Sequence, residues 1–400
     1  MTLPPVFRMD FLNEFPSAVP DNNDRRVKGM KTILITGGAG FIGAHVTEEL
    51  IMHGYEVRVL DNLSPQVHGP DRLRPVYLHP DAELITGDVR DPEIVRRALS
   101  GIDAVFHFAA MVGVGQSMYE MEKYTSTNNT GTAVLLEALL ENPVERLIVA
   151  SSMSIYGEGL CRTEGGRIST PLERTAEQFE RRDWELTNID QERLRPSPTP
   201  ETKLPQLASV YALSKYHQER MCLIFGNAYG IETVGLRFFN VFGKHQSLSN
   251  PYTGVLAIFA SRILNGNPPL IYEDGKQMRD FVHVKDVAVA CRLALEKPEA
   301  DGMVFNIGSG QPRTILSISE QMTNLIGEKK IRPKITYKYR IGDIRHCFAD
   351  IKLAARILGY VPQVPFQQGL LELASWLGQQ KPKDYFSEAE TQLEARRLTL

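Results

Sequence analysis

The sequence predicts a doubly wound α/β fold, in which a parallel β-sheet carries helices on both faces, followed by a smaller C-terminal α/β domain. Three observations lead to this prediction. Short β-rich apolar runs alternate with segments of helical periodicity up to about residue 240. A glycine-rich turn directly follows the first of these runs. Beyond residue 240 the loops lengthen, and proline and glycine cluster.

The elements alternate along the first half of the chain. The expected strands cover residues 31–36, 56–61, 82–88, 104–110, 146–152 and 232–240. The expected helices cover residues 41–54, 91–101, 127–142 and 209–230. Strands that alternate with helices indicate parallel pairing, because parallel strands need crossover connections. Residues 303–310 form a further strand candidate, which could return to the first domain.

The organisation predicted from these patterns has two domains. Residues 30–240 form the first domain, residues 241–380 form the second, and residues 1–29 form a loose extension. The polar segment 157–208 is an insertion that either lies beside the active site or has no part in it. The charged tail, residues 381–400, favours a solvated helix or a frayed end over a binding element.

Composition excludes several classes of function. The formal net charge of −3 gives no reason to expect nucleic acid or an anionic membrane as a partner. No apolar run approaches the length that spans a membrane, and the N-terminus lacks the order of a secretory signal. The four cysteines are far apart, which argues against disulfides or a metal site and suits a cytoplasmic protein.

The stretch "ITGGAGFIG" has the context of a phosphate-binding turn, because it follows a strand and opens a helix. Gly37 permits the tight turn, Gly40 allows the backbone to approach a pyrophosphate, and Gly43 lets the helix pack on the strand. Phe41 and Ile42 open the helix, whose N–H groups and positive dipole end would face the phosphates.

Acidic residues follow the next two strands. Asp61 closes the second strand, where a carboxylate binds the adenosine ribose hydroxyls and repels a 2′-phosphate, so that NAD is favoured over NADP. Asp88, after the third strand, is placed to meet the adenine amino group. The neighbouring Asn62 and Val89 are expected to contact the cofactor, as is Ala109 at the end of the fourth strand.

Tyr211 and Lys215, in "SVYALSK", are four residues apart and share one face of the expected helix. Taken alone, such a pair is more often an ordinary surface pair than a proton-transfer site. The strand, the glycine turn and the acid upstream favour catalysis in this chain.

With these motifs and "SSMSIYG" in this order, the chain resembles the extended short-chain dehydrogenase/reductases, and among them the nucleotide-sugar epimerase and dehydratase branch. The resemblance implies a Rossmann NAD domain, a domain for a UDP- or dTDP-linked sugar, and a homodimer formed through helices at 118–141 and 209–227. It assigns Ser152, Tyr211 and Lys215 to catalysis, Asn128 to the cofactor, and Asn240, Arg279, Arg340, Asp343 and Cys347 to the substrate, with Ser152 also touching the sugar.

The resemblance also bears on the chemistry. The phenol of Tyr211 is expected to act as the base, with its pKa lowered by the Lys215 ammonium and the nicotinamide charge. Dehydratases of this branch carry Asp-Glu directly after the active-site Ser or Thr, where this chain has Met153 and Ser154. We therefore expect a 4-epimerase rather than a dehydratase.

Other interpretations stay open at this point. A nucleotide-sugar 4-ketoreductase, a decarboxylase and a non-catalytic NAD-binding sensor are the alternatives. "DNLSPQVHG" and the insertion resemble the dTDP-L-rhamnose 4-epimerase group. Val112 and Gly254 depart from the galactose epimerases, which carry Lys and Asn there. Cys347 either makes room for bulkier sugars or is a small buried hydrophobe.

Overall fold

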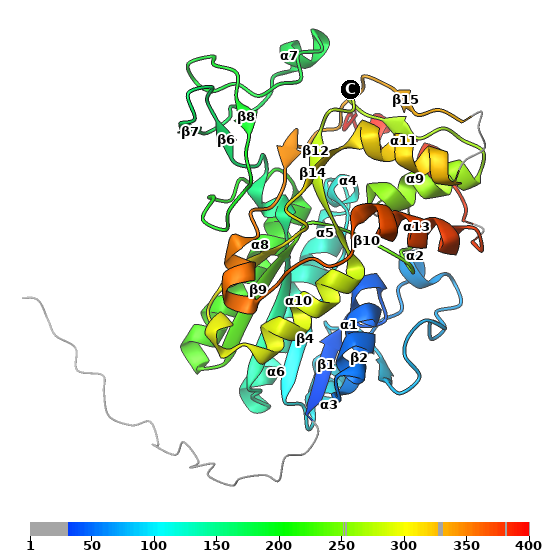
Figure 1. Cartoon of the computed structure of the whole chain (residues 1–400). Helices are drawn as coiled ribbons and strands as arrows, with labels where there is room; N and C mark the ends of the chain where they lie inside the picture. The colour runs from blue at the N-terminus through cyan, green and yellow to red at the C-terminus, as the bar shows by residue number, and fades with distance from the viewer. Residues whose placement is uncertain (1–30, 251, 253, 327–330, 381, 400) are drawn as a thin grey trace, which may run out of the picture. The chain divides into compact units, whose positions relative to one another are not determined.

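A seven-stranded parallel β-sheet forms the centre of the computed structural model, which describes residues 31–250, 252, 254–326, 331–380 and 382–399 (Figure 1). Its strands are β1 (Thr32–Thr36), β2 (Glu56–Asp61), β3 (Glu83–Thr86), β4 (Ala104–His107), β5 (Arg146–Ser152), β9 (Glu232–Phe238) and β13 (Val304–Ile307). They lie in the order β13-β9-β5-β4-β1-β2-β3, and every neighbouring pair is parallel. The extension expected at residues 1–29 lies outside the described residues.

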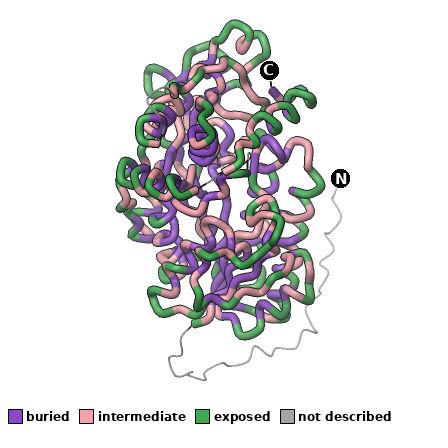
Figure 2. Tube along the Cα trace, turned by 90° about the vertical axis from the view of Figure 1, so that its right-hand side faces the viewer, coloured by how far each residue is buried: buried purple, intermediate pink, exposed green. Residues whose placement is uncertain are grey.

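Helices cover both faces of this sheet, which confirms the doubly wound fold. One face carries α1 (Phe41–Met52), α10 (Val284–Glu296) and α12 (Lys352–Leu358), and the other carries α3 (Pro92–Leu99), α6 (Gly131–Glu141) and α8 (Val210–Tyr229). Each set shares a separate apolar core with the strands. Figure 2 shows the buried residues gathered inside the body and the exposed residues around its outer surface.

The strand order reverses between β1 and β4. The chain runs from β1 through β2 to β3, then returns to the other side of β1. Open α/β sheets bind ligands at the carboxyl ends of the strands at such a reversal. Gly37 follows β1 with φ of +71°, and a Cβ on it would lie 2.8 Å from the backbone N of Ala109. Glycine therefore allows the two strand ends to approach each other closely.

A second lobe lies beyond the carboxyl edge of the sheet. Its strands are β10 (Asn240–Phe242), β11 (Leu270–Ile271), β12 (Met278–His283), β14 (Pro312–Thr314), β15 (Lys334–Ile335) and β16 (His346–Cys347), and its helices are α9 (Val255–Leu264), α11 (Ile315–Ile326) and α13 (Phe366–Leu377). The sequence predicted one strand over 232–240, but the strand is broken at Phe239. β10 pairs with β12, so Asn240 belongs to the second lobe. β13, in contrast, returns to the central sheet.

The helix expected near 118–141 is composed of shorter pieces. These are α5 (Met121–Tyr124), a π-helical turn (Thr125–Thr130) and α6, preceded by α4 (Val114–Ser117). A π-helical turn inside a helix often marks a functional position, since it shifts the side chains that follow it.

Residues 157–208 form an ordered unit, which we call the insert lobe. It contains β6 (Cys161–Arg162), β7 (Ile168–Ser169), α7 (Ala176–Glu180) and β8 (Arg195–Pro196), with the strands in the antiparallel order β7-β6-β8. These elements stand at the upper left of Figure 1. Backbone bonds from Gly159 N to His346 O (2.7 Å) and from Thr199 N to Phe348 O (2.8 Å) attach the insert lobe to β16 and the residue after it.

The charged tail forms helix α14 (Phe386–Ala395). Ala389 and Leu393 on this helix are buried, at 6% and 4% exposure. The tail thus forms one of the two expected structures, a helix, but this helix is not solvated on every side. Ala389 and Leu393 are four residues apart and so lie on one face of α14. This face is buried although the helix also carries several charged side chains.

A buried ion pair joins α8 to the central sheet. Arg237 of β9 donates two hydrogen bonds to the Glu219 carboxylate of α8, at 2.9 and 2.7 Å, and a third to the Tyr156 hydroxyl at 2.8 Å. The exposed fractions of the Arg237 and Glu219 side chains are 6% and 0%. Helix α8 also carries Tyr211 and Lys215. The ion pair of Arg237 with Glu219 therefore fixes the height of the Tyr211 and Lys215 side chains over the sheet.

We expect Arg237→Met to lower the free energy of unfolding by about 3–5 kcal/mol, because it leaves the Glu219 charge buried and unpaired. Arg96→Met, which breaks the exposed pair of Arg96 with Glu141, is the matched control and is expected to cost at most about 1 kcal/mol. Urea unfolding measures both values. If both variants lost the same small amount of unfolding free energy, the buried pair would not hold α8 on the sheet.

Candidate active site

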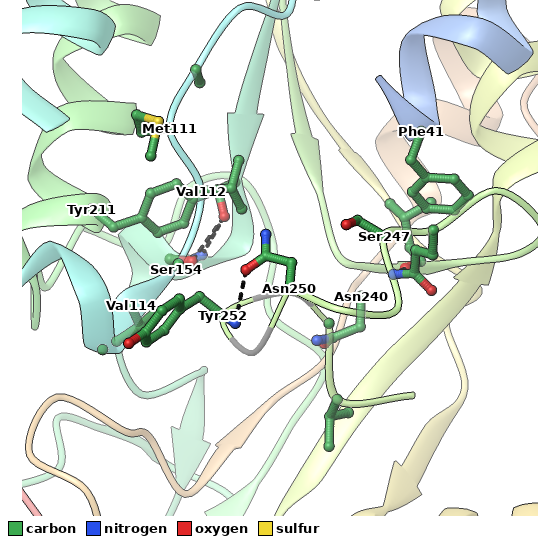
Figure 3. Close-up of a pocket in the computed structure, with 18 of the residues that line it drawn as sticks. Phe41, Met111, Val112, Val114, Ser154, Tyr211, Asn240, Ser247, Asn250 and Tyr252 are labelled. Carbon is green, nitrogen blue, oxygen red and sulfur yellow. Dashed lines mark hydrogen bonds between the residues drawn. The ribbon is translucent and has the colours of Figure 1, made fainter. Parts of the chain in front are cut away.

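A cavity of about 630 Å³ lies at the carboxyl ends of β1, β4 and β5. Most of the residues predicted from the sequence line it: Gly37, Gly40, Phe41, Ile42, Gly43, Asp61, Asn62, Asp88, Val89, Ala109, Ser152, Tyr211, Lys215, Asn240, Arg279, Arg340 and Asp343. Asn128 and Cys347 are not among the lining residues. Figure 3 shows Tyr211, Asn240 and Tyr252 around the same space, each from a different segment.

The turn between β1 and α1 leaves the N-terminus of α1 open to the cavity. Gly40 is the N-cap residue and has an extended backbone without a side-chain cap. A Cβ on Gly43 would lie 2.5 Å from Gly37 O, so a larger residue would push α1 away from the turn. The first N–H groups of a helix lack intrahelical acceptors and carry the positive dipole end. The turn therefore suits the phosphates of a dinucleotide.

A carboxylate stands at the end of β2. Asp61 accepts hydrogen bonds from the backbone N–H groups of Ala39 (3.1 Å) and Leu63 (2.9 Å). Burial raises the pKa of Asp61, and these N–H groups and the nearby His68 oppose the rise. His68 Nε2 lies 3.8 Å from the Asp61 carboxylate. Sequence reasoning missed His68, because only the folded loop brings helix α2 (Pro65–His68) back over β2.

Asp88 forms a bidentate pair with Arg90, with both N–O distances at 2.8 Å, and accepts a hydrogen bond from the Asn62 amide at 3.1 Å. These hydrogen bonds, led by those of Arg90, lower the pKa of Asp88 to about 2. The carboxylate is therefore ionised at neutral pH and acts only as an acceptor. Such a group suits the adenine amino donor that the sequence analysis assigned to it.

The Tyr211 ring points into the cavity from the first turn of α8 (Figure 3). Tyr211 is 8% exposed, and Ser152 at the end of β5 is 7% exposed. Burial raises the pKa of Tyr211, while hydrogen bonding with the Ser152 side chain lowers it. The oxygen of Ser152 is in turn held by Ser154, through its N–H at 3.1 Å and its hydroxyl at 2.8 Å. Sequence reasoning did not assign Ser154 to the site.

Lys215 is buried on the same face of α8. Its ammonium donates to Gln218 Oε1 at 2.7 Å, and burial lowers its pKa to about 8. The amide of Gln218 donates to Thr132 Oγ1 at 2.9 Å. Burial also lowers the pKa of the adjacent His107 to about 3, so the imidazole is neutral. Gln218 and His107 were missed, although Gln218 follows Lys215 by three residues on one helical face.

The expected lowering of the Tyr211 pKa includes the charge of a bound nicotinamide and stays a prediction. In the protein alone, burial outweighs the other influences and raises the pKa of Tyr211. The reason is that a buried phenolate loses its hydration, while Lys215 directs its ammonium to Gln218. A phenolate at neutral pH therefore requires further positive charge in the cavity.

Asn128, in the π-helical turn, lies behind the cavity wall. Its amide bonds both backbone groups of Met111, at 2.7 Å to the N–H and 3.1 Å to the carbonyl oxygen, and donates to Ser214 Oγ at 2.9 Å. It thus ties the loop after β4 to α8. This placement does not support the predicted direct contact of Asn128 with a cofactor. Asn128 instead positions the loop after β4 against α8.

Two polar groups mark the far half of the cavity. Asn240 Oδ1 is buried and has no hydrogen-bond partner among the described residues. Arg279 donates to the backbone carbonyls of Met278 and Arg345, both at 2.9 Å, and burial lowers its pKa. A half-buried guanidinium that binds carbonyl groups retains its positive charge for an anion such as a diphosphate.

Arg340 and Asp343 pair with each other at the cavity wall, with N–O distances of 3.1 and 2.7 Å. Cys347 is 1% exposed and packs with Tyr156 and Phe239 behind Arg279. Of the two interpretations of Cys347, the structure therefore favours the small buried hydrophobe.

Further lining residues come from segments without a recognisable motif. Gln246 and Gln277 line the cavity, and the buried side-chain oxygen of each has no hydrogen-bond partner among the described residues. Phe386, Glu390 and Leu393 of α14 also line it. The sequence gives little indication that these residues belong to the site. Isolated glutamines and residues of the C-terminal tail match no motif with a fixed spacing.

The described residues contain no group of three or more His, Cys, Asp or Glu side chains arranged to hold a metal ion. That the protein binds no metal is a prediction from the sequence, and it stays a prediction. None of the helices in the same part of the chain is long and apolar enough to cross a membrane.

Comparisons with known proteins agree with this geometry. Residues 33–182 and 187–308 match the model of the NAD dependent epimerase/dehydratase family. A dTDP-L-rhamnose 4-epimerase from Burkholderia thailandensis is 35% identical over 364 residues, which cover 90% of this chain and 98% of that protein.

Solved structures match over a similar length. UDP-glucose 4-epimerase from Thermotoga maritima, solved with UDP-glucose, has a TM-score of 0.71 and 32% identity, covering 87% of this chain and 98% of that one. The Thermus thermophilus UDP-glucose 4-epimerase complex with NAD has a TM-score of 0.68 and 30% identity, covering 88% and 100%. The resemblance to nucleotide-sugar epimerases and the NAD cofactor expected from the sequence are confirmed. The chain belongs to the NAD dependent epimerase/dehydratase family.

Proposed function

We propose that this chain is a nucleotide-sugar 4-epimerase, which oxidises C4 of a UDP- or dTDP-linked sugar to a ketone and reduces it again on the opposite face. One observation supports this most directly. Ser152, Tyr211 and Lys215 line the same cavity as the phosphate turn and Arg279. The phosphate turn therefore offers polar groups to a dinucleotide, and Arg279 offers a charge to a sugar diphosphate. Both lie in the cavity that contains the Tyr211 phenol.

The residues present fit NAD. The open N-terminus of α1 suits its pyrophosphate, and Asp61 suits the ribose hydroxyls. When NAD is bound, it supplies a reversible acceptor for the hydride of C4, so no external reductant is consumed. The protein supplies orientation and proton transfer.

Tyr211 takes the proton of the C4 hydroxyl during oxidation and returns a proton to the same oxygen during reduction. Ser152, held by Ser154, hydrogen bonds that oxygen and keeps it near the phenol. The Lys215 ammonium stabilises the phenolate, whose formation burial opposes. Proton loss and gain balance over the cycle, as an epimerisation requires.

The residues beside Ser152 disfavour dehydration. Met153 has no acidic proton, and the Ser154 hydroxyl hydrogen bonds Ser152. Elimination of a sugar hydroxyl needs a general acid to protonate the leaving group. Neither residue can serve as that acid at neutral pH.

At the other end of the cavity, Arg279 and Asn240 are proposed to bind the substrate diphosphate. The charge of Arg279 attracts the phosphates, and Asn240 can turn its amide toward a phosphate oxygen. The paired Arg340 and Asp343 are proposed to contact the nucleotide. The cytoplasm remains the expected location of the protein.

We also propose a homodimer formed through α8 and the helices beside it. Leu213 and Ile224 on α8 are 53% and 60% exposed. They lie eleven residues apart, about three turns, and so on one face. Leu140 of α6 is 50% exposed as well. A second copy of the chain would remove this apolar surface from water.

The proposed reaction is tested with a panel of UDP-, dTDP- and GDP-sugars, each mixed with the NAD-loaded enzyme and followed by NMR. We expect inversion at C4 for at least one UDP- or dTDP-sugar without added NADH. Net formation of NADH, or release of carbon dioxide from a uronate, would contradict an epimerase and support the ketoreductase or decarboxylase.

In the same assay Tyr211→Phe is expected to lower turnover by about 10²–10⁴-fold, the usual contribution of general acid–base catalysis. NAD binding, measured by fluorescence, is expected to persist because the phosphate turn is untouched. Full turnover of this variant would remove Tyr211 from the mechanism.

Gln218 provides a test through pH. Lys215 carries its charge below its pKa of about 8 and loses it above. Gln218→Leu removes the acceptor of the ammonium, so the alkaline limb of kcat/KM is expected to move to lower pH by about one unit. Gln218→Glu adds a negative charge and is expected to move the same limb to higher pH. Identical profiles for both variants would contradict a role for the Lys215 charge.

The dimer is tested by sedimentation. We expect the wild-type chain to sediment as a dimer and the Leu213→Asp/Ile224→Asp variant as a monomer, because charges in an apolar interface remain unpaired. Leu204→Asp, at a position 81% exposed in the insert lobe, is the control and is expected to stay dimeric. A monomeric wild type would refute the proposal.

A further inference from the structure

The segment Tyr337–Asp343, which we call the substrate strap, carries Arg340 and Asp343 to the cavity wall. It follows β15 and is bound on two sides. The rings of Tyr337 and Tyr339 contact the insert lobe, whereas the ammonium of Lys338, between them, contacts α14. The strap is therefore placed between two elements that are distant in sequence.

Aromatic stacking holds the strap to the insert lobe. Phe179 of α7 stacks on Tyr339, with ring centroids 3.6 Å apart and an interplanar angle of 19°. The Arg182 guanidinium lies 4.3 Å from the centroid of the Tyr337 ring. Aromatic pairs contribute about 0.5–1.5 kcal/mol beyond their buried area. The insert lobe therefore restricts the backbone on both sides of Lys338.

Buried charges extend this contact toward the cavity. Arg174 of the insert lobe pairs with Glu273 at 2.7 Å, and the two side chains are 5% and 3% exposed. The Glu273 N–H donates to Lys338 O at 2.7 Å, and Arg174 donates to Asp343 O at 3.3 Å. Arg174 thus connects to both ends of the strap. Because the pair is buried, water screens it little.

A second buried arginine lies just past the strap. Arg345 is fully buried and donates to Glu185 of the insert lobe at 2.6 Å and to Glu273 at 2.8 Å. Glu158, at the start of the insert lobe, accepts the backbone N–H of Arg345 at 2.7 Å. The insert lobe therefore also fixes the exit of the strap.

Helix α14 holds the other side. Lys338 pairs with Glu394 at 2.7 Å and with Glu390 at 3.1 Å. Past the end of the helix, Leu398 O accepts the N–H of Ile341 at 2.9 Å. Thr399 forms a β-bridge with Arg340. The tail thus pairs with the strap through side chains and backbone, and one of the residues it contacts, Arg340, lines the cavity.

We propose that the insert lobe and α14 are a two-sided clamp that positions Arg340 and Asp343 for the nucleotide part of the substrate. This rests on the proposed function, which assigns these two residues to the nucleotide sugar. Residues of the clamp, such as Phe179 and Glu394, are positioning residues, because they act through the strap. Loosening either side leaves the strap with more conformations to lose when substrate binds.

The test uses Phe179→Ala for one side and Glu394→Ala, which leaves the cavity-lining Glu390 in place, for the other, in the full-length NAD-loaded enzyme. For a nucleotide sugar that the wild type converts, each variant is expected to raise KM about tenfold and to change kcat less than about twofold, because binding but not chemistry is affected. Phe179→Tyr keeps the stacked ring and is expected to restore the wild-type KM. Glu388→Ala, at an exposed position on α14, is the matched control and is expected to leave both constants unchanged.

Hydrogen exchange of the strap amides provides a readout without substrate. Phe179→Ala and Glu394→Ala are expected to raise exchange across residues 337–343 at least about fivefold. Unchanged exchange in both variants would overturn the clamp, as would a wild-type KM in a variant with a loosened strap. If the wild type converts no nucleotide sugar, the proposed function fails instead. In that event, loosened exchange in the variants would still support the clamp as the device that holds Arg340.

Discussion

The burial of a charged amine beside a phenol is the constraint on which the rest of the site depends. Lys215 loses most of its hydration, and its pKa falls to about 8 as a result. Gln218 Oε1 accepts a hydrogen bond from this ammonium, and the Gln218 amide in turn donates to Thr132 of α6. Lys215 and Gln218 both belong to α8, and the contact with Thr132 requires α8 to pack beside α6. The buried pair of Arg237 with Glu219 joins α8 to β9.

Burial also explains why the two halves of the cavity differ in their polar groups. A dry site raises the pKa of Tyr211 and so keeps the phenol protonated until positive charge is brought near it. The cofactor half is built from backbone and carboxylates around the strand reversal, where charges are paired or bonded by N–H groups. In the half proposed for the substrate, Asn240 Oδ1 has no hydrogen-bond partner among the described residues. The positive charge of Arg279, and not this acceptor oxygen, makes that half complementary to an anionic ligand.

The substrate half is assembled from distant parts of the chain. Arg279 comes from the second lobe, Arg340 from the strap, and Leu393 from the C-terminal helix. Within the insert lobe only Ala208, its last residue, lines the cavity, but the lobe contacts the strap through Arg174 and Phe179.

The parallel sheet, the phosphate turn and the Tyr211–Lys215 pair were all predictable from the sequence, because each depends on local periodicity or on a fixed spacing along one element. Most predicted site residues do line one cavity, since the carboxyl ends of parallel strands necessarily meet at one edge. The break after β9, the positions of Asn128 and Cys347, and the direction of the Tyr211 pKa were decided only by the tertiary structure. So were the roles of His68, Gln218 and the C-terminal helix. The reason is that burial and long-range contacts determine these features, and no spacing along the chain records them.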